Sequence, residues 1–230
     1  MRKWYPCCIL LVLYVIHIST GPLYESMMVA VEQKLSGLVI VIDAGHGGRD
    51  NGASVESVWE DGINLAVAKE LQEILEMAGA VVVMTRESDV DLASEDALNR
   101  KREDLARRVE IIEEDDVALF ISVHMNKYGD SGVSGAQVFY RTNDDTSKAL
   151  AQSIQERFKE LGSNKLVKIG NFYLLNESTT PGVLVECGFL SHPKERELLQ
   201  QKEYQVKLAY TIYQGIVDHV TQQYGALIAT

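Results

Sequence analysis

The chain has 230 residues, 46% hydrophobic and 24% charged, a balance typical of a folded globular protein that excludes a disordered or fibrous one. Its 33 acidic and 22 basic residues give a formal net charge of −11, which argues against a nucleic-acid-binding protein, because phosphate binding needs clustered Lys and Arg. Cys7 and Cys8 lie in the apolar N-terminus and Cys187 stands alone, so an internal disulfide in the folded part and a thiolate zinc finger are both excluded.

The first segment of the chain has the pattern of an export signal. Arg2 and Lys3 precede an apolar run over residues 7–18, as the charged region of a signal peptide precedes its hydrophobic region. This run is shorter than the ~20 residues that span a bilayer comfortably. Because Pro22 disfavours cleavage after the small residues before it, we expect residues 1–30 to form an uncleaved or poorly cleaved signal or membrane anchor.

Beyond this segment, short apolar runs alternate with amphipathic stretches. Residues 38–42 form a continuous apolar run bounded by glycines, which predicts a buried strand. Apolar residues then recur at helical spacing over 63–78, and Gly79 is suited to cap that helix. A second strand is predicted over 81–84 and a charged amphipathic helix over 98–113.

The second half of the chain continues the alternation. The expected elements are strands at 118–123, 136–140, 171–175 and 183–185, and helices at 146–161, 194–200 and 203–223. Strands that alternate with helices of this length predict an α/β fold. We therefore expect a single catalytic domain over 38–222, with a mostly parallel or mixed central sheet covered by helices on both faces.

Polar side chains follow three of the predicted strands at the points where the strands end: Asp43 and His46, His124 and Asn126, and Glu186. In open α/β sheets, ligands bind beyond the carboxyl ends of the strands. The sequence therefore predicts an active site at this edge of the sheet.

Two of these residues are histidines, which favours a zinc site. Catalytic zinc is held by three protein ligands and a water, so His46 and His124 need a carboxylate as the third ligand. Glu60, at the start of a predicted helix, is the candidate, although neighbouring acids compete with it. Glu186 then remains as a general base, because a glutamate within a buried apolar strand is costly unless it has a partner or a function.

In this order, the motifs resemble those of the zinc-dependent N-acetylmuramoyl-L-alanine amidases of bacterial cell walls, the amidase-3 type. The resemblance extends over about residues 38–220 and is carried by residues 42–48, 60, 85–86, 122–126 and 184–191. It implies that His46, Glu60 and His124 bind Zn²⁺ and that Glu186 is catalytic. The resemblance is the firmer basis for choosing Glu60.

The resemblance also implies the reaction, which is hydrolysis of the amide between the lactyl group of N-acetylmuramic acid and L-alanine in peptidoglycan stem peptides. One catalytic domain behind an export segment, together with residues 170–176, is most similar to the germination-specific spore-cortex amidases. That similarity implies a role in spore-cortex maturation, in the pathway that forms muramic lactam. Peptidoglycan is then the substrate, an accessory lipoprotein is a partner that the resemblance allows, and the protein acts outside the cytoplasm.

Supporting roles are expected for three further residues. Asp43 would orient His46, and Asn126 or Arg86 would shape the pocket, with a structural ion pair as the favoured alternative for Arg86. The acidic run over 87–96 is expected to be a solvated loop, with a calcium or partner site as the alternative.

Other functions stay open at this point. A zinc carboxypeptidase on wall peptides uses similar chemistry, and a catalytically silent wall-binding protein is a second alternative. A cysteine hydrolase that uses Cys187 competes poorly, because its thiolate would be disfavoured beside Glu186. A dinucleotide-binding loop at Gly45 fails, because the third glycine of that motif is missing.

Overall fold

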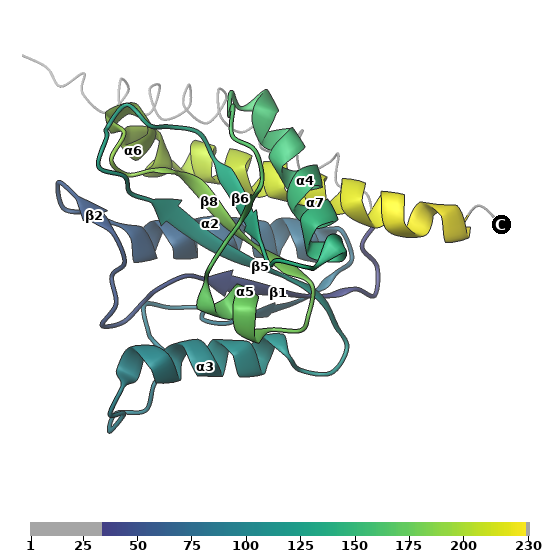
Figure 1. Cartoon of the computed structure of the whole chain (residues 1–230), viewed down its shortest axis with the longest axis horizontal. Helices are drawn as coiled ribbons and strands as arrows, with labels where there is room; N and C mark the ends of the chain where they lie inside the picture. Colours follow the sequence, from purple (N-terminus) through teal and green to yellow (C-terminus); the bar gives the residue numbers. More distant parts are fainter. Residues whose placement is uncertain (1–33, 229–230) are drawn as a thin grey trace, which may run out of the picture. The chain divides into compact units, whose positions relative to one another are not determined.

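The centre of the fold is a six-stranded sheet (Figure 1). In order across the sheet, its strands are β4 (Val81–Met84), β1 (Val39–Ala44), β5 (Val117–Asn126), β8 (Gly182–Phe189), β6 (Gln137–Tyr140) and β7 (Lys168–Ile169). The first four run parallel, whereas β6 pairs antiparallel with β8, so the sheet is mixed. A separate hairpin joins β2 (Ser54–Val55) and β3 (Val58–Trp59).

Helices cover both faces of this sheet. They are α2 (Glu60–Met77), α3 (Arg100–Ile112), α4 (Asp145–Glu160), α5 (Tyr173–Glu177), α6 (Pro193–Leu199) and α7 (Lys202–Ile228). Both α2 and α4 pack against α7 on one face, while α3 and α5 pack together on the other (Figure 1). The predicted α/β fold, with a mixed sheet between helical layers, is confirmed.

The computed structural model describes residues 34–228 of the chain. The expected signal or anchor over 1–30 lies outside these residues and stays a prediction. These described residues form one compact unit. None of the helices within 34–228 is both long and apolar enough to cross a membrane.

One predicted strand is wrong. Residues 171–175 contribute to a short helix, α5, in which the amide of Asn176 donates to the carbonyl of Phe172 at 3.0 Å. The amide of Ser178 likewise donates to the carbonyl of Leu174 at 3.1 Å. Five residues are too few for periodicity to separate a strand from a helical turn, because either can bury two leucines. Here Leu174 and Leu175 are both buried against the sheet.

The apolar core beneath α3 and α5 defines the face of the sheet on which the polar strand ends lie. Val41, Phe120 and Leu184, from three adjacent strands, belong to this core. Side chains alternate along a strand, so the same face carries the residues two and four positions further on. The strand register pairs Asp43 with Ser122 and His124 with Glu186. These polar residues therefore lie on the face of the sheet that α3 and α5 cover, at the carboxyl edge of the sheet.

The placement of α5 in this core predicts that Leu175→Ala lowers the free energy of unfolding by about 2–4 kcal/mol, because it removes a fully packed side chain. Chemical denaturation measures the change. Leu166→Ala is the matched control, since Leu166 is 74% exposed, and it should cost less than about 0.5 kcal/mol. Equal losses in the two variants would contradict the packing of α5.

Candidate metal centre

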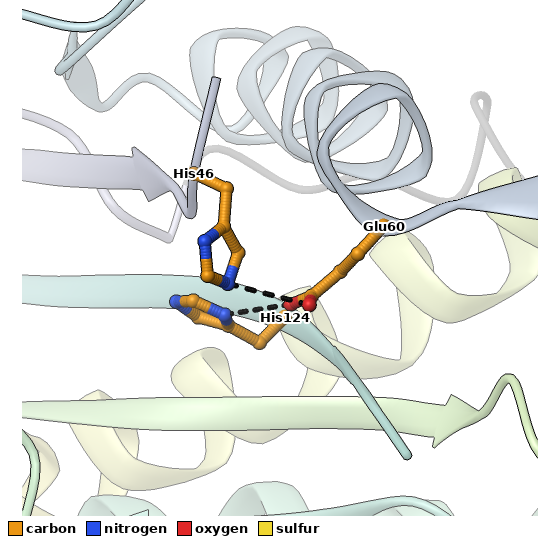
Figure 2. A group of neighbouring side chains, drawn as sticks. All are labelled: His46, Glu60 and His124. Carbon is orange, nitrogen blue, oxygen red and sulfur yellow. Dashed lines mark hydrogen bonds and ion pairs between the residues drawn. The ribbon is translucent and has the colours of Figure 1, made fainter. Parts of the chain in front are cut away.

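Three side chains from three separate elements converge at the carboxyl edge of the sheet (Figure 2). His46 follows β1, Glu60 is the first residue of α2, and His124 lies in β5. Nδ1 of His124 is 2.8 Å from Oε1 of Glu60, and Nε2 of His46 is 3.3 Å from Oε2. Within residues 34–228, this is the one group of at least three His, Cys, Asp or Glu that could hold a metal ion.

The loop after β1 places His46 by an unusual backbone conformation. His46 has a φ of 61°, in the left-handed region, where a residue with a side chain is strained. Gly47 and Gly48 follow with φ of 121° and 62°. Arg108 holds the turn, because its guanidinium donates to the carbonyl of His46 at 2.7 Å and to that of Ala44 at 2.9 Å.

Arg108 is a buried cation with two carboxylate partners. Its guanidinium lies 2.7 Å from Asp43 and 3.0 Å from Asp104, and its side chain is 1% exposed. The sequence predicts that Asp43 orients His46, and in the structure its carboxylate contacts Arg108, Thr85 and Ser122. It therefore reaches His46 through Arg108 and the backbone rather than through the imidazole.

Glu60 is held as a fixed, ionised carboxylate. Burial alone would raise its pKa, but the hydrogen bonds and charges of His124 and His46 outweigh burial and hold the pKa well below its usual range. The backbone amides of Ala53 and Met125 also donate to it, at 2.8 and 3.2 Å. Its two oxygens are thus fixed toward the two imidazoles, as Figure 2 shows.

Asp50 orients the imidazole of His46 and was not identified from the sequence. Its Oδ2 lies 3.1 Å from Nδ1 of His46, which leaves Nε2 facing Glu60. Burial would raise the pKa of Asp50, but its contacts with His46 and Lys101 lower it to about 2. An acid four residues after a histidine, in a glycine-rich turn, was the available signal.

Two glycines allow the backbone to approach the converging side chains. A Cβ on Gly45 would lie 2.2 Å from the ring of His124. Gly52, at a φ of 68°, would place a Cβ 2.5 Å from Oε2 of Glu60 and 2.6 Å from Cδ2 of His46. Glycine is therefore required at both positions by contact with the site.

Glu186 enters the same pocket from β8 with an unpaired oxygen. Its side chain is almost fully buried, and no residue within 34–228 hydrogen bonds to its Oε2. Burial raises the pKa of Glu186 to about 7, and the charge of Glu60 adds to the increase. A buried polar atom without a partner is costly, so it indicates a function.

A pocket of about 350 Å³ connects these residues. Its walls include His46, Glu60, His124 and Glu186, and also Asn126. Arg86 is not among the lining residues.

Arg86 and the acidic run both support the β1 loop. Arg86 binds backbone carbonyls, including those of Ala44 and Gly45 at 2.8 and 3.0 Å, so its structural role uses carbonyls instead of the ion pair that the sequence suggested. The acidic run is more than a solvated loop, because Asp89 and Asp91 accept hydrogen bonds from the amides of residues 48 and 49.

The cysteine-hydrolase alternative does not fit this environment. Cys187 is 1% exposed, and burial together with the charge of Glu186 raises the pKa of its thiol far above its usual range. A buried thiol that resists ionisation is a poor nucleophile.

Several known proteins are similar to this chain in sequence and in fold. A family model described as N-acetylmuramoyl-L-alanine amidase matches residues 40–218. The chain is 40% identical over 195 residues to the germination-specific N-acetylmuramoyl-L-alanine amidase of Bacillus subtilis (strain 168), with 82% of each chain covered.

Two solved structures are also similar. The CwlD amidase from Clostridioides difficile, in complex with the GerS lipoprotein, matches with a TM-score of 0.78 and 39% identity, over 81% of this chain and 100% of that one. The catalytic domain of CwlV from Bacillus (Paenibacillus) polymyxa matches with a TM-score of 0.69 and 33% identity, over 82% of this chain and 98% of that one.

The contact between Gly45 and His124 predicts that Gly45→Ala weakens the affinity of this site for a metal ion by about 10- to 100-fold, because the new Cβ displaces the imidazole. Competition with a fluorescent zinc chelator measures the affinity. Gly62→Ala is the control, since nothing lies within 4 Å of a Cβ there. Unchanged affinity in both variants would contradict the geometry of this site.

Proposed function

This chain belongs to the N-acetylmuramoyl-L-alanine amidase family, and we propose that it works through a zinc ion bound by His46, Glu60 and His124, with Glu186 as the catalytic carboxylate. Its reaction is hydrolysis of the amide that joins the lactyl group of N-acetylmuramic acid to L-alanine in a peptidoglycan stem peptide. The observation that carries the proposal is the convergence of two imidazoles and a carboxylate beside a buried, unpaired Glu186 oxygen.

The three proposed ligands fit zinc in number and in chemistry. Two nitrogens and one carboxylate oxygen lie within 4.8 Å of one another, and this donor set leaves a position for water, as catalytic zinc sites require. Bound zinc would supply a water acidified to a pKa of about 7 and would polarise the scissile carbonyl. Asp50 and Arg108 fix the ring and the backbone of His46, so that the site is already formed when the substrate binds.

Glu186 carries the proton in the proposed reaction. Its Oε2 accepts a proton as water attacks the lactyl carbonyl carbon, and the same oxygen then gives that proton to the departing nitrogen of L-alanine. The C–N bond breaks, and the products are the lactyl carboxylate and a peptide with a free amino terminus. Asn126 lines the pocket and is suited to position the amide of the substrate.

The full set of side chains favours catalysis over the remaining alternatives. A silent wall-binding protein would not need a buried carboxylate with an unpaired oxygen next to three converged ligands. A zinc carboxypeptidase would share the chemistry but release single terminal residues, so the products separate the two activities.

The biological setting follows from the relatives. Similarity to a germination-specific amidase, and to an amidase solved with a lipoprotein, supports action on spore-cortex peptidoglycan with an accessory lipoprotein as partner. This setting requires export, which agrees with the signal or anchor expected over residues 1–30.

We predict that Glu186→Gln lowers kcat by at least about 100-fold, because Gln cannot accept the proton, while zinc content stays at the wild-type level. Peptide release from purified peptidoglycan gives the rate, and elemental analysis gives the zinc. Glu177→Gln, an exposed change on α5, should leave both unchanged. A Glu186→Gln enzyme with full activity would exclude the proposed role.

A chelator should abolish activity, and added zinc should restore it, because the proposed reaction needs the metal. Mass spectrometry of peptidoglycan treated with the zinc-loaded protein should then show peptides that begin with free L-alanine. Release of single terminal amino acids would instead indicate a carboxypeptidase, and unchanged activity in chelator would exclude the metal mechanism.

A further inference from the structure

The pocket at the metal centre adjoins a second hollow of about 270 Å³. Six charged residues line that hollow: Arg49, Asp50, Asp91, Arg100, Lys101 and Asp104. Asp50, Lys101 and Asp104 belong to the walls of both pockets. The second hollow therefore leads from the metal centre across the loop after β1 and the first turn of α3.

The carboxylates of this hollow are already paired with neighbouring cations. Asp91 pairs with Arg100 at 2.8 Å and Asp50 with Lys101 at 3.2 Å, while Asp104, at 3.0 Å, shares Arg108 with Asp43. These three acids are therefore not available to bind another cation.

Arg49 is the cation that remains. Its side chain is exposed, and its guanidinium has no hydrogen bond or ion pair with any residue between 34 and 228, whereas its backbone amide binds Asp91 at 3.3 Å. Among the six residues that line the hollow, whose three acids and three bases balance, Arg49 is therefore the one cation without a carboxylate partner. Guanidinium groups bind carboxylates through two parallel hydrogen bonds, so an anionic ligand suits this position.

The wall of the pocket nearest α5 is aromatic and apolar. Phe172 and Tyr173 line it together with Leu184, and they are packed against the core from the start of α5. α5 packs against β8, whereas Arg49 follows β1, and β5 lies between these two strands. The metal centre thus lies between the aromatic residues at the start of α5 and the loop that carries Arg49.

We propose that the stem peptide of the substrate leaves the metal centre on the β1 side, where Arg49 binds one of its carboxylates. This inference rests on the proposed function, since it concerns a muramyl peptide whose lactyl group is attached to the peptide through the scissile amide. The sugar is then uncharged and matches the aromatic wall, while the acidic peptide matches the wall that contains Arg49. Lys101 is the neighbouring cation, but its pairing with Asp50 makes it a secondary contact.

Two muramyl tripeptides test the proposal, identical except for a free carboxylate or a carboxamide on the second residue of the peptide. The full-length, zinc-loaded protein should hydrolyse the acid with a kcat/KM roughly tenfold higher, mainly through a lower KM. Arg49→Gln should reduce this preference to about one, and Arg49→Lys should retain part of it. Lys148→Gln, an exposed change on α4, is the control and should retain all of it.

Calorimetry with the Glu186→Gln protein separates this inference from the proposed function. The same two peptides should bind with a roughly tenfold difference in Kd, which Arg49→Gln should remove in the Glu186→Gln background. A binding preference without hydrolysis by the wild type would contradict the proposed function and leave the subsite standing. Hydrolysis without any preference, or a preference that survives Arg49→Gln, would overturn the inference.

A second lysine provides one more discriminating outcome. Lys127 also lines the pocket, at the end of β5, where its ammonium donates to the carbonyl of Ser54 at 3.0 Å. Lys127→Gln should keep the acid preference. Loss of the preference in Lys127→Gln with retention in Arg49→Gln would place the carboxylate at Lys127 and refute the proposed direction of the peptide.

Discussion

The buried ion pair between Arg108 and Asp43 is the interaction on which the site depends. It joins α3 to the end of β1, and the same guanidinium fixes the carbonyl of His46 in a loop that turns through a left-handed residue. Breaking a buried pair of this kind costs about 3–5 kcal/mol, because the partner charge is left without compensation. The hydrogen bonds from this guanidinium to the carbonyls of Ala44 and His46 hold the strained turn, so the imidazole keeps a position that the local backbone does not favour.

The parallel strands bring the chemistry to one edge. Because β1, β5 and β8 run in the same direction, residues far apart in the chain meet at their carboxyl ends, with His124 opposite Glu186. Each residue then acquires a distinct environment. Glu60 is surrounded by donors and stays charged, whereas Glu186 is buried with an unpaired oxygen. Two glutamates in one pocket are thereby suited to two tasks, one as a metal ligand and one as a proton carrier.

Much of the fold and of the metal centre was predictable from the sequence. Long apolar runs indicate buried strands, and polar residues at the ends of parallel strands indicate a ligand-binding site. The strand before His46, the strand before His124 and the α/β alternation all followed from such patterns. The failures have physical causes. Residues 171–175 are too short for periodicity to identify a helical turn, and the link from Asp43 to Arg108 joins residues 65 positions apart, which no local pattern reveals. The spacing of Asp50, four residues after His46, was a usable signal, but it is weaker than the patterns around His46, Glu60 and His124.

The most direct test of the central claim is X-ray diffraction from the purified protein at the zinc absorption edge. We predict one anomalous peak, bonded to nitrogens of His46 and His124 and to an oxygen of Glu60 at about 2.0–2.2 Å, with Glu186 close by but not bonded. A peak coordinated by Glu186 instead of Glu60, or a zinc-loaded crystal with no peak at these residues, would contradict it.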